Sequence, residues 1–242
     1  FALGMIGIPN VADALAAVKK VVFEEKKYTM AELVDALDRN FEGYEGLLHQ
    51  LEKAPKFGND DDYVDLIAKR ILSDAGDYVA QFHTHYGAKF ATACFAMTTN
   101  VMFGRLVGAL PDGRKAGLPL SEGGISPYQG RNISGAPATM RSVAKLDQVK
   151  LALGSILNMR IDPDAVKNDE KMDRMVSLLR TFCETGGNLV QFNFASNAVL
   201  RAAQKDPDQY RDLLVRVATY SAFFVELGPE TQEDIINRNE LE

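Results

Sequence analysis

The chain has few cysteines, a deficit of basic residues and no long apolar run. It contains two cysteines, Cys94 and Cys183, which are too few for a disulfide framework, so a reducing cytoplasm is the expected location. Its 27 basic residues are outnumbered by 33 acidic ones, for a net charge of −6. This deficit argues against a nucleic-acid-binding protein, which usually presents a basic face. No apolar run approaches the ~18–20 residues of a membrane-spanning helix.

What is present is an ordinary globular composition. Hydrophobic residues make up 46% and charged residues 25% of the 242 residues. These shares exclude collagen-like and disordered chains and allow a sizeable core. The chain opens at Phe1 without an initiator Met or a charged leading segment. We therefore expect a piece of a longer protein rather than a translation start or a secretory signal.

The first 87 residues are predicted to be mostly helical. Asn10 is the expected cap of a helix with one apolar stripe, formed by Val11, Leu15, Val18, Val21 and Val22. Thr29 and Glu32 form a capping box that opens the next helix. A third helix over 47–51 should end near Pro55. Asn59, followed by three aspartates, is the expected cap of a long helix that runs toward His85.

Strands and helices alternate in the second half, which favours an α/β layer or barrel. We expect strands at 89–97, 156–161, 189–194 and 213–217, the one at 213–217 being the last, and helices at 172–182, 199–203 and 231–239. Residues 107–136 are too rich in glycine and proline for a regular element.

Histidines offer one metal candidate. His83 and His85 would share a face on a strand but diverge on the predicted helix, and the only other histidine is His49. Helix-end histidines near a favourable dipole are the preferred interpretation.

The Gly-rich segment 110–117 invites comparison with a phosphate-binding loop, but it matches neither the Walker nor the dinucleotide pattern. A Pro-Asp-Gly turn held by a structural Arg114 is the favoured interpretation. Cys94 and Cys183 are more typical of inert packing residues than of nucleophiles. A metal- or phosphate-using α/β enzyme is therefore a weak alternative, and residue patterns alone assign no activity.

The end of the chain carries a more specific signal. Residues 206–227 (DPDQYRDLLVRVATYSAFFVEL) and 232–238 (QEDIINR) resemble the carboxy-terminal signature of glycyl radical enzymes. This family includes pyruvate formate-lyase, cobalamin-independent dehydratases and choline trimethylamine-lyase. Residues 21–62, 109–120, 142–147 and 187–193 resemble family segments in family order. The sequence of residues 109–147 is more similar to the dehydratase and choline-lyase branch than to pyruvate formate-lyase.

The resemblance implies a radical loop at Arg216, Val217, Ala218, Thr219, Tyr220 and Ser221. The family motif Arg-Val-x-Gly-Tyr carries the radical on the glycine Cα, which must be planar so that the unpaired electron is shared with the flanking amides. Glycine also allows backbone angles closed to other residues. Thr219 occupies this position here, and a β-branched side chain crowds that plane. The resemblance therefore predicts that this chain does not store the usual radical.

A second functional part of the family is a cysteine that forms a thiyl radical and attacks the substrate. Neither Cys94 nor Cys183 lies in a matching context, so we expect that cysteine loop to be absent from this chain. Gln191 and Asn193 are candidate barrel or substrate contacts. The alternative for both is a buried polar group satisfied by backbone hydrogen bonds.

The family implies an α/β fold that is part of a ten-stranded barrel, with a helical first third and a carboxy-terminal radical domain. Residues 1–105 would be the end of the pyruvate formate-lyase-like barrel domain, and residues 106–242 the glycyl radical segment. No bound metal or organic cofactor is implied, because a separate radical S-adenosylmethionine activating enzyme installs the radical. Expected partners are that enzyme, the missing amino-terminal part of the barrel and further copies in a homo-oligomer.

The full-length relatives are expected to perform radical dehydration, elimination or C–C cleavage on small hydroxylated or carboxylated substrates. The alternative is a non-catalytic degenerate subunit or assembly domain with the same fold. Apolar faces left uncovered in such a partial barrel would favour partner binding or aggregation.

Overall fold

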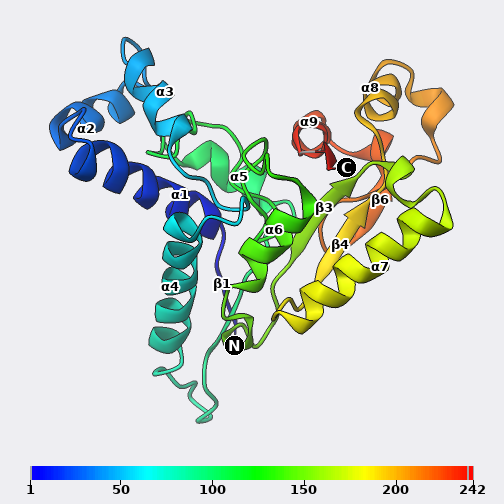
Figure 1. Ribbon diagram of the computed structural model, residues 1–242, viewed down its shortest axis with the longest axis horizontal. Coiled ribbons are helices and arrows are strands. Elements are labelled where there is room, and N and C mark those ends of the chain that lie inside the picture. The colour runs from blue at the N-terminus through cyan, green and yellow to red at the C-terminus, as the bar shows by residue number, and fades with distance from the viewer. Residues whose placement is uncertain (1, 239, 242) are drawn as a thin grey trace.

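The computed structural model describes residues 2–238 and 240–241, and it combines a helical half with a strand-centred half (Figure 1). The first half contains α1 (Ile8–Val18), α2 (Met30–Asp38), α3 (Glu45–Lys53) and α4 (Asp62–Val79). The second half contains α5 (Thr99–Leu106), α6 (Gly135–Ala144), α7 (Asp169–Glu184), α8 (Asn197–Lys205) and α9 (Pro229–Asn237). None of the described helices combines the length and apolar character needed to cross a bilayer.

The capping box at Thr29 is confirmed. The Glu32 backbone N–H donates to Thr29 Oγ1 at 3.2 Å, and the Thr29 N–H donates to the Glu32 carboxylate at 2.7 Å. This reciprocal pair satisfies two donors at the start of α2 within four residues of sequence. The third helix is also confirmed, with Leu47 and Leu51 buried.

The role expected for Asn10 is wrong. The α1 helix begins after Gly7, which has a φ of 82°, so Asn10 lies inside the helix. Its side-chain oxygen accepts from the Ser121 N–H at 2.7 Å, and its amide donates to Asp112 at 2.8 Å. The predicted stripe is partly wrong, because Val11 and Leu15 are exposed. The small side chains of Ala12, Ala16 and Ala17 are buried instead.

A π-helix, η1 (Lys19–Glu24), continues α1 and buries Val21 and Val22. Beyond the next two helices, Asp61 rather than Asn59 caps α4, since its carboxylate accepts from the Tyr63 N–H at 2.9 Å. The Asn59 oxygen accepts instead from the N–H groups of Ile133 and Ser134. The α4 helix ends at Val79, six residues before His85.

The strands form three small sheets within the described residues. β1 (Ala2–Gly4) pairs in parallel with β2 (Ala91–Ala93), and an isolated bridge between Cys94 and Ser155 leads toward the next sheet. There β3 (Leu157–Ile161) lies between β4 (Val190–Asn193) and β7 (Glu240–Leu241), in parallel with both. β5 (Leu214–Arg216) and β6 (Ser221–Phe223) form an antiparallel hairpin.

The expected strands at 156–161 and 189–194 are confirmed, whereas the strand expected over 89–97 is shortened to Ala91–Ala93. The expectation that 213–217 is the last strand is wrong, since β6 and β7 follow it. The terminal helix is confirmed as α9, although residue 239 lies outside the described residues. The described strands make an open arrangement, so this chain by itself has the α/β character of the expected fold but not a ten-stranded barrel.

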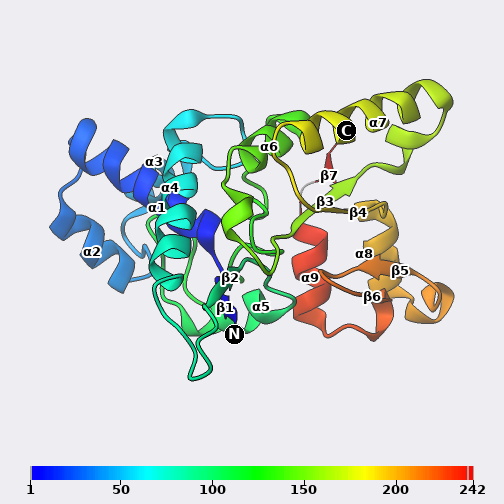
Figure 2. The same ribbon diagram turned by 90° about the horizontal axis from the view of Figure 1, so that it is seen from below.

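The hydrophobic side chains form separate clusters. The largest joins residues 8–72 with residues 94–182 around Phe57, Leu72 and Leu157. Another fills the space between η1, α2 and α3. A third cluster belongs to the carboxy-terminal part alone, from Ala195 to Ile236. Figure 2 shows α8, α9, β5 and β6 grouped together at one end of the molecule.

The prediction of no regular element over 107–136 is confirmed for residues 107–134, whereas α6 already begins at Gly135. The segment 120–127 is nevertheless buried. Gly124 makes this burial possible. It has a φ of 132°, and a Cβ built on it would lie 2.1 Å from the Cys94 carbonyl oxygen. The backbone of the loop therefore runs directly against the chain that follows β2, at a distance that only glycine allows.

We predict that Gly124→Ala strongly destabilises the chain, by more than ~3 kcal/mol, because the clash is with backbone that cannot rotate away. Gly117→Ala is the matched control. Gly117 also has a positive φ, of 80°, but nothing lies within 4 Å of its Cβ position. The control should cost only about 1–2 kcal/mol of backbone strain. Urea denaturation of the two variants checks this, and equal losses would contradict the steric explanation.

Candidate functional site

The predicted radical loop is the turn of the β5–β6 hairpin. Arg216 pairs with Ser221 across the hairpin, and the Val217 N–H donates to the Tyr220 carbonyl at 3.0 Å. Ala218 and Thr219 therefore lie at the end of the turn, which we call the tip of the loop. Ala218 is fully buried, whereas the Thr219 side chain is exposed. The structure thus brings all six predicted loop residues into one tight turn.

The backbone at Thr219 is ordinary. Positive φ values occur at five non-glycine residues of the described chain, and Thr219 is not among them. The residues with positive φ are Lys26, Asn40, Phe41, Asp60 and Met97. In this structure the turn accommodates threonine without left-handed backbone angles, so the conformational argument for glycine finds no support here. The argument from the planarity of a radical-bearing Cα does not depend on φ and is unaffected.

Asn193 at the end of β4 holds the stem of the loop. Its side-chain oxygen accepts from the Arg216 N–H at 3.1 Å, and its amide donates to the Arg216 carbonyl at 2.9 Å. The side-chain amide of Asn193 thus makes the two hydrogen bonds with Arg216 that the backbone of a neighbouring strand would make. Gln191 accepts from Arg216 Nε at 3.0 Å. Both candidate barrel residues are therefore neighbours of the loop, and a substrate contact by either stays a prediction.

Arg238 holds the loop from the other side. It directly follows α9, is 8% exposed, and donates from one terminal nitrogen to the Val217 carbonyl at 2.9 Å. Its other terminal nitrogen donates to Asp234 at 2.9 Å and lies 4.0 Å from Glu122. Burial raises the pKa of Glu122, although Arg238 opposes the shift. Burial lowers the pKa of Arg238, but the carboxylates of Glu122 and Asp234 outweigh it and raise the pKa overall.

These contacts belong to a layer of buried and half-buried polar side chains between the carboxy-terminal cluster and the rest of the chain, which we call the polar seam. Arg160 on β3 donates to the carbonyls of Ile235 and Ile236 and to Asn197. Asn100 donates to Asp234 at 3.3 Å, and Asn158 donates to Glu122. The seam consists of Asn100, Glu122, Gln129, Asn158, Arg160, Asn193, Arg216, Asp234 and Arg238. Two cavities of about 20 and 10 Å³ lie along it, each about the size of one water molecule.

A groove of about 380 Å³ opens beside the loop. Arg216 and Ser221 of the loop line it, together with mostly apolar side chains that include Phe194 and Leu214. Phe194 is 45% and Leu214 is 58% exposed. The loop is therefore flanked by an uncovered apolar surface, as expected of a partial barrel.

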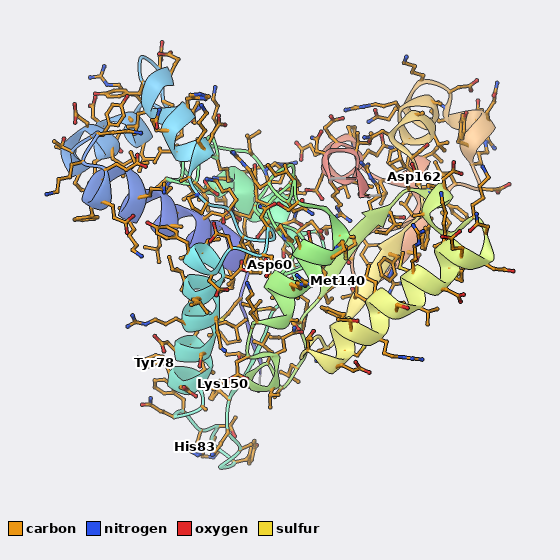
Figure 3. All side chains as sticks on the ribbon, viewed as in Figure 1. Asp60, Tyr78, His83, Met140, Lys150 and Asp162 are labelled. Atoms are coloured by element: carbon orange, nitrogen blue, oxygen red, sulfur yellow. The ribbon has the colours of Figure 1, made fainter. Side chains whose placement is uncertain are left out.

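The other sequence candidates lie elsewhere. His83 and His85 are in an exposed turn beyond α4, where His83 bridges to Lys89 (Figure 3). The prediction that they end a helix is wrong, because α4 stops at Val79. Among the described residues no group of three or more His, Cys, Asp or Glu is arranged to hold a metal ion.

Arg114 has the structural role predicted for it. The side chain is buried, and its nitrogens donate to the carbonyls of Gly104, Val107, Gly108, Leu118 and Pro119. A guanidinium already bound to five carbonyls has no donor left for a phosphate. Its backbone N–H donates to Asp112 at 2.9 Å, which closes the Pro-Asp-Gly turn.

A buried ionisable pair lies behind this loop. Asp13 on α1 accepts from the Phe57 N–H at 2.7 Å, and Lys56 donates to the carbonyls of Leu51 and Ala54. Burial raises the pKa of Asp13 to about 8 and lowers the pKa of Lys56 to about 8. Both shifts have the same cause, because burial disfavours the charged form of either group.

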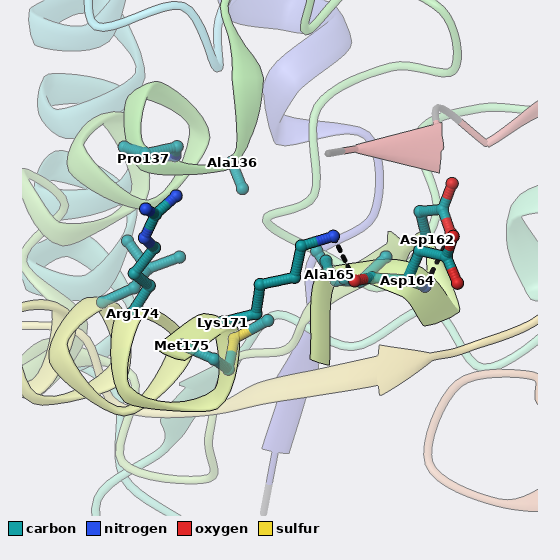
Figure 4. A pocket seen from close by; sticks show the side chains of 10 residues that line it. Ala136, Pro137, Asp162, Asp164, Ala165, Lys171, Arg174 and Met175 are labelled. Atoms are coloured by element: carbon teal, nitrogen blue, oxygen red, sulfur yellow. Dashed lines mark hydrogen bonds between the residues drawn. The ribbon is translucent and has the colours of Figure 1, made fainter. Parts of the chain in front are cut away.

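Another cavity, of about 560 Å³, is lined by no residue of the loop. It lies between α6, α7 and the short helix Pro163–Val166 (Figure 4). Lys171 crosses its mouth and donates to the Asp164 carbonyl at 2.7 Å. Its lining shares no residue with that of the groove beside the loop, although Pro163 of the groove lies between Asp162 and Asp164 of this cavity.

Sequence reasoning missed the polar seam. Arg238 stands in the segment that resembles the family signature, but its spacing says nothing about a contact with Val217. Glu122 lies in a Gly-rich stretch and Arg160 lies in a strand. At both positions a charged side chain is expected to be exposed to solvent. A charge inside an apolar strand, as in LNMRI, is the one local signal that could have indicated Arg160.

Known families match most of the chain. A family model described as "Pyruvate formate lyase-like" matches residues 1–104, and one described as "Glycine radical" matches residues 121–225. Trans-4-hydroxy-L-proline dehydratase of Clostridioides difficile is 41% identical over 236 residues, which cover 97% of this chain and 30% of the relative. Isethionate sulfite-lyase of Oleidesulfovibrio alaskensis is 40% identical, with 97% and 28% covered.

The fold gives the same result. The glycerol-bound B12-independent glycerol dehydratase from Clostridium butyricum superposes with a TM-score of 0.95 at 41% identity, covering 99% of this chain and 31% of that one. The chain thus spans about 30% of the length of these relatives. These relatives are dehydratases and lyases, as the sequence of residues 109–147 predicts.

We predict that stability falls as the pH rises from about 4 toward about 8, because folded Asp13 retains a proton that the unfolded chain releases. Each such proton contributes a slope of up to about 1.4 kcal/mol per pH unit. Asp13→Asn, which mimics the protonated form, should remove this component. Asp208→Asn, an exposed aspartate, controls for the change in charge. Urea denaturation from pH 5 to 8 measures the slopes, and an unchanged slope in Asp13→Asn would rule out this assignment.

The two thiols should differ in reactivity. Burial raises the pKa of Cys94 to about 12, whereas Cys183 is exposed on α7. Because the thiolate is the reactive form, a thiol reagent at pH 8 should label Cys183 alone in the folded chain and both thiols after unfolding. Cys183→Ser should abolish native labelling. Rapid labelling of Cys94 in that folded variant would be the opposite result.

Proposed function

The chain belongs to the glycyl radical enzyme family, and from this we propose that it is the carboxy-terminal portion of a dehydratase or lyase in which Thr219 holds the radical position. The substrate would be a small hydroxylated or carboxylated molecule. The dehydratase and lyase activities of the relatives support this reaction class.

The observation that carries the proposal is the position of Thr219. It stands in Arg-Val-Ala-Thr-Tyr where the family motif has glycine, within the residues that the glycine radical model matches, at the tip of a turn held from both sides. A glycine Cα that loses one hydrogen atom becomes planar and shares its unpaired electron with the adjacent amides. With threonine the Cα keeps a β-branched substituent that crowds this plane. We infer that the chain as it stands stores no glycyl radical.

The remaining parts of the proposal follow from the family. A thiyl-forming cysteine would lie in a part of the barrel outside these residues, because Cys94 is buried in the core and Cys183 lies on the outer face of α7. The complete protein would close a ten-stranded barrel, form a homo-oligomer and receive its radical from an S-adenosylmethionine-dependent activating enzyme. The division at residue 105 and the cytoplasmic location also stay predictions.

A non-catalytic assembly domain is the second candidate. The uncovered apolar groove around Phe194 and Leu214 favours it, because such a surface can bind a partner without any chemistry. Thr219 favours it too, since a subunit without radical chemistry has no need for glycine at the tip.

Electron paramagnetic resonance separates these candidates. The full-length polypeptide that carries this chain is treated anaerobically with its activating enzyme, S-adenosylmethionine and a reductant. We expect no glycyl doublet from the unsubstituted protein and a doublet from Thr219→Gly, because glycine restores a Cα that can become planar. Ala218→Gly, which places a glycine one residue away, is the matched control and should give no doublet.

A doublet in the unsubstituted protein would contradict the role given to Thr219. No signal from Thr219→Gly, with an activating enzyme shown to be competent on a cognate partner, would favour the assembly domain instead.

A further inference from the structure

Arg238 is the contact through which the end of the chain reaches the tip of the loop. The Val217 carbonyl that it binds at 2.9 Å belongs to a fully buried residue two positions before Thr219. Bulk water therefore does not reach this carbonyl in the folded chain. If Arg238 were removed, a buried acceptor would lose its partner.

The guanidinium itself is fixed from two directions. Asp234, one turn earlier on α9, accepts from it at 2.9 Å, and Glu122 of the buried segment 120–127 lies 4.0 Å away. Asp234 is in turn held by Asn100 and Gln129, which donate to its other oxygen. Asp234 and Glu122 both lie at one terminal nitrogen of Arg238, and the other terminal nitrogen donates to the Val217 carbonyl. A planar guanidinium fixed at one nitrogen in this way also fixes the direction of the other.

The other backbone groups of the stem are already satisfied. The N–H and carbonyl of Arg216 bind Asn193, and the Val217 N–H binds the Tyr220 carbonyl. The Val217 carbonyl is the group of the stem that binds the segment directly after α9.

We propose that Arg238 is the positioning residue of the tip: it fixes the backbone at Val217 and so determines where residue 219 lies relative to the segment 120–127. The proposal rests on the function proposed above, because a defined tip position matters only if residue 219 has a chemical role. The contact itself does not depend on that function. Arg238 acts through the Val217 carbonyl and has no part in any bond-breaking step.

Hydrogen exchange in the full-length protein tests the contact. Arg238→Gln should raise the amide exchange rates of residues 217–220 at least tenfold while leaving those of α7 (Asp169–Glu184) within twofold. Arg238→Lys should give an intermediate increase, because an ammonium can bind the carbonyl but cannot also form the fork to Asp234. Arg201→Gln is the matched control. Arg201 also binds α9, through Glu233 at 2.6 and 2.7 Å, but at an exposed site away from the loop.

The outcomes are distinct. Unchanged exchange at 217–220 in Arg238→Gln would overturn the proposal. Equal acceleration of 217–220 and α7 in both Arg238 variants would also overturn it, because the residue would then serve only general stability. Acceleration at the tip alone, graded from lysine to glutamine and absent in Arg201→Gln, is the expected result.

Radical yield supplies a second readout. In the Thr219→Gly protein, Arg238→Gln should lower the yield of the glycyl doublet at least tenfold, and Arg238→Lys should restore part of it. If Thr219→Gly alone gives no doublet, the proposed function fails, while the exchange experiment still decides the role of Arg238. If it gives a full doublet that Arg238→Gln leaves unchanged, the positioning role fails and the proposed function stands.

Discussion

Buried backbone carbonyls need partners, and at three places in the described chain arginines supply them. Arg114 binds five carbonyls between Gly104 and Pro119, Arg160 binds the end of α9, and Arg238 binds the turn of the β5–β6 hairpin. In segments without helix or strand these donors replace hydrogen bonds that regular structure would supply. The arrangement of the loops therefore depends on a small set of guanidinium groups.

The same requirement separates the molecule into parts of different character. The central cluster around Leu72 and Leu157 is apolar, and so is the cluster from Ala195 to Ile236, but the seam between them is polar and has water-sized cavities. Contacts across such a seam are directional, whereas apolar contacts are not. The hairpin packs on the carboxy-terminal cluster through Val215 and Val217, and hydrogen bonds across the seam orient it relative to the rest of the chain. The role proposed for residue 219 would require such an orientation.

Local features were predictable from the sequence and distant ones were not. The capping box at Thr29 spans four residues, and the β3 and β4 strands follow from short apolar runs, so their patterns contain all that determines them. Asn10 has the side chain of a helix cap, but its partners lie more than 100 residues away, at Asp112 and Ser121. The loop residues 216–221 were identified by resemblance, yet nothing in their spacing indicates Arg238. Tertiary partners decided these roles, and a single sequence does not reveal them.

The π-helix after α1 has a consequence for how the helical half accommodates changes in chain length. Buried positions run from Ala12 to Ala16 at a spacing of four, and then from Ala16 to Val21 and from Ala17 to Val22 at a spacing of five. The wider turn of the π-helix accommodates one additional residue. The residues before it, Ala12 and Ala16, therefore face the central cluster, and the residues within it, Val21 and Val22, face the cluster formed with α2 and α3. A homologue with one residue fewer here would form an uninterrupted α-helix with the same two faces. Insertions and deletions in this region would therefore alter the winding of the helix and leave the neighbouring helices in place.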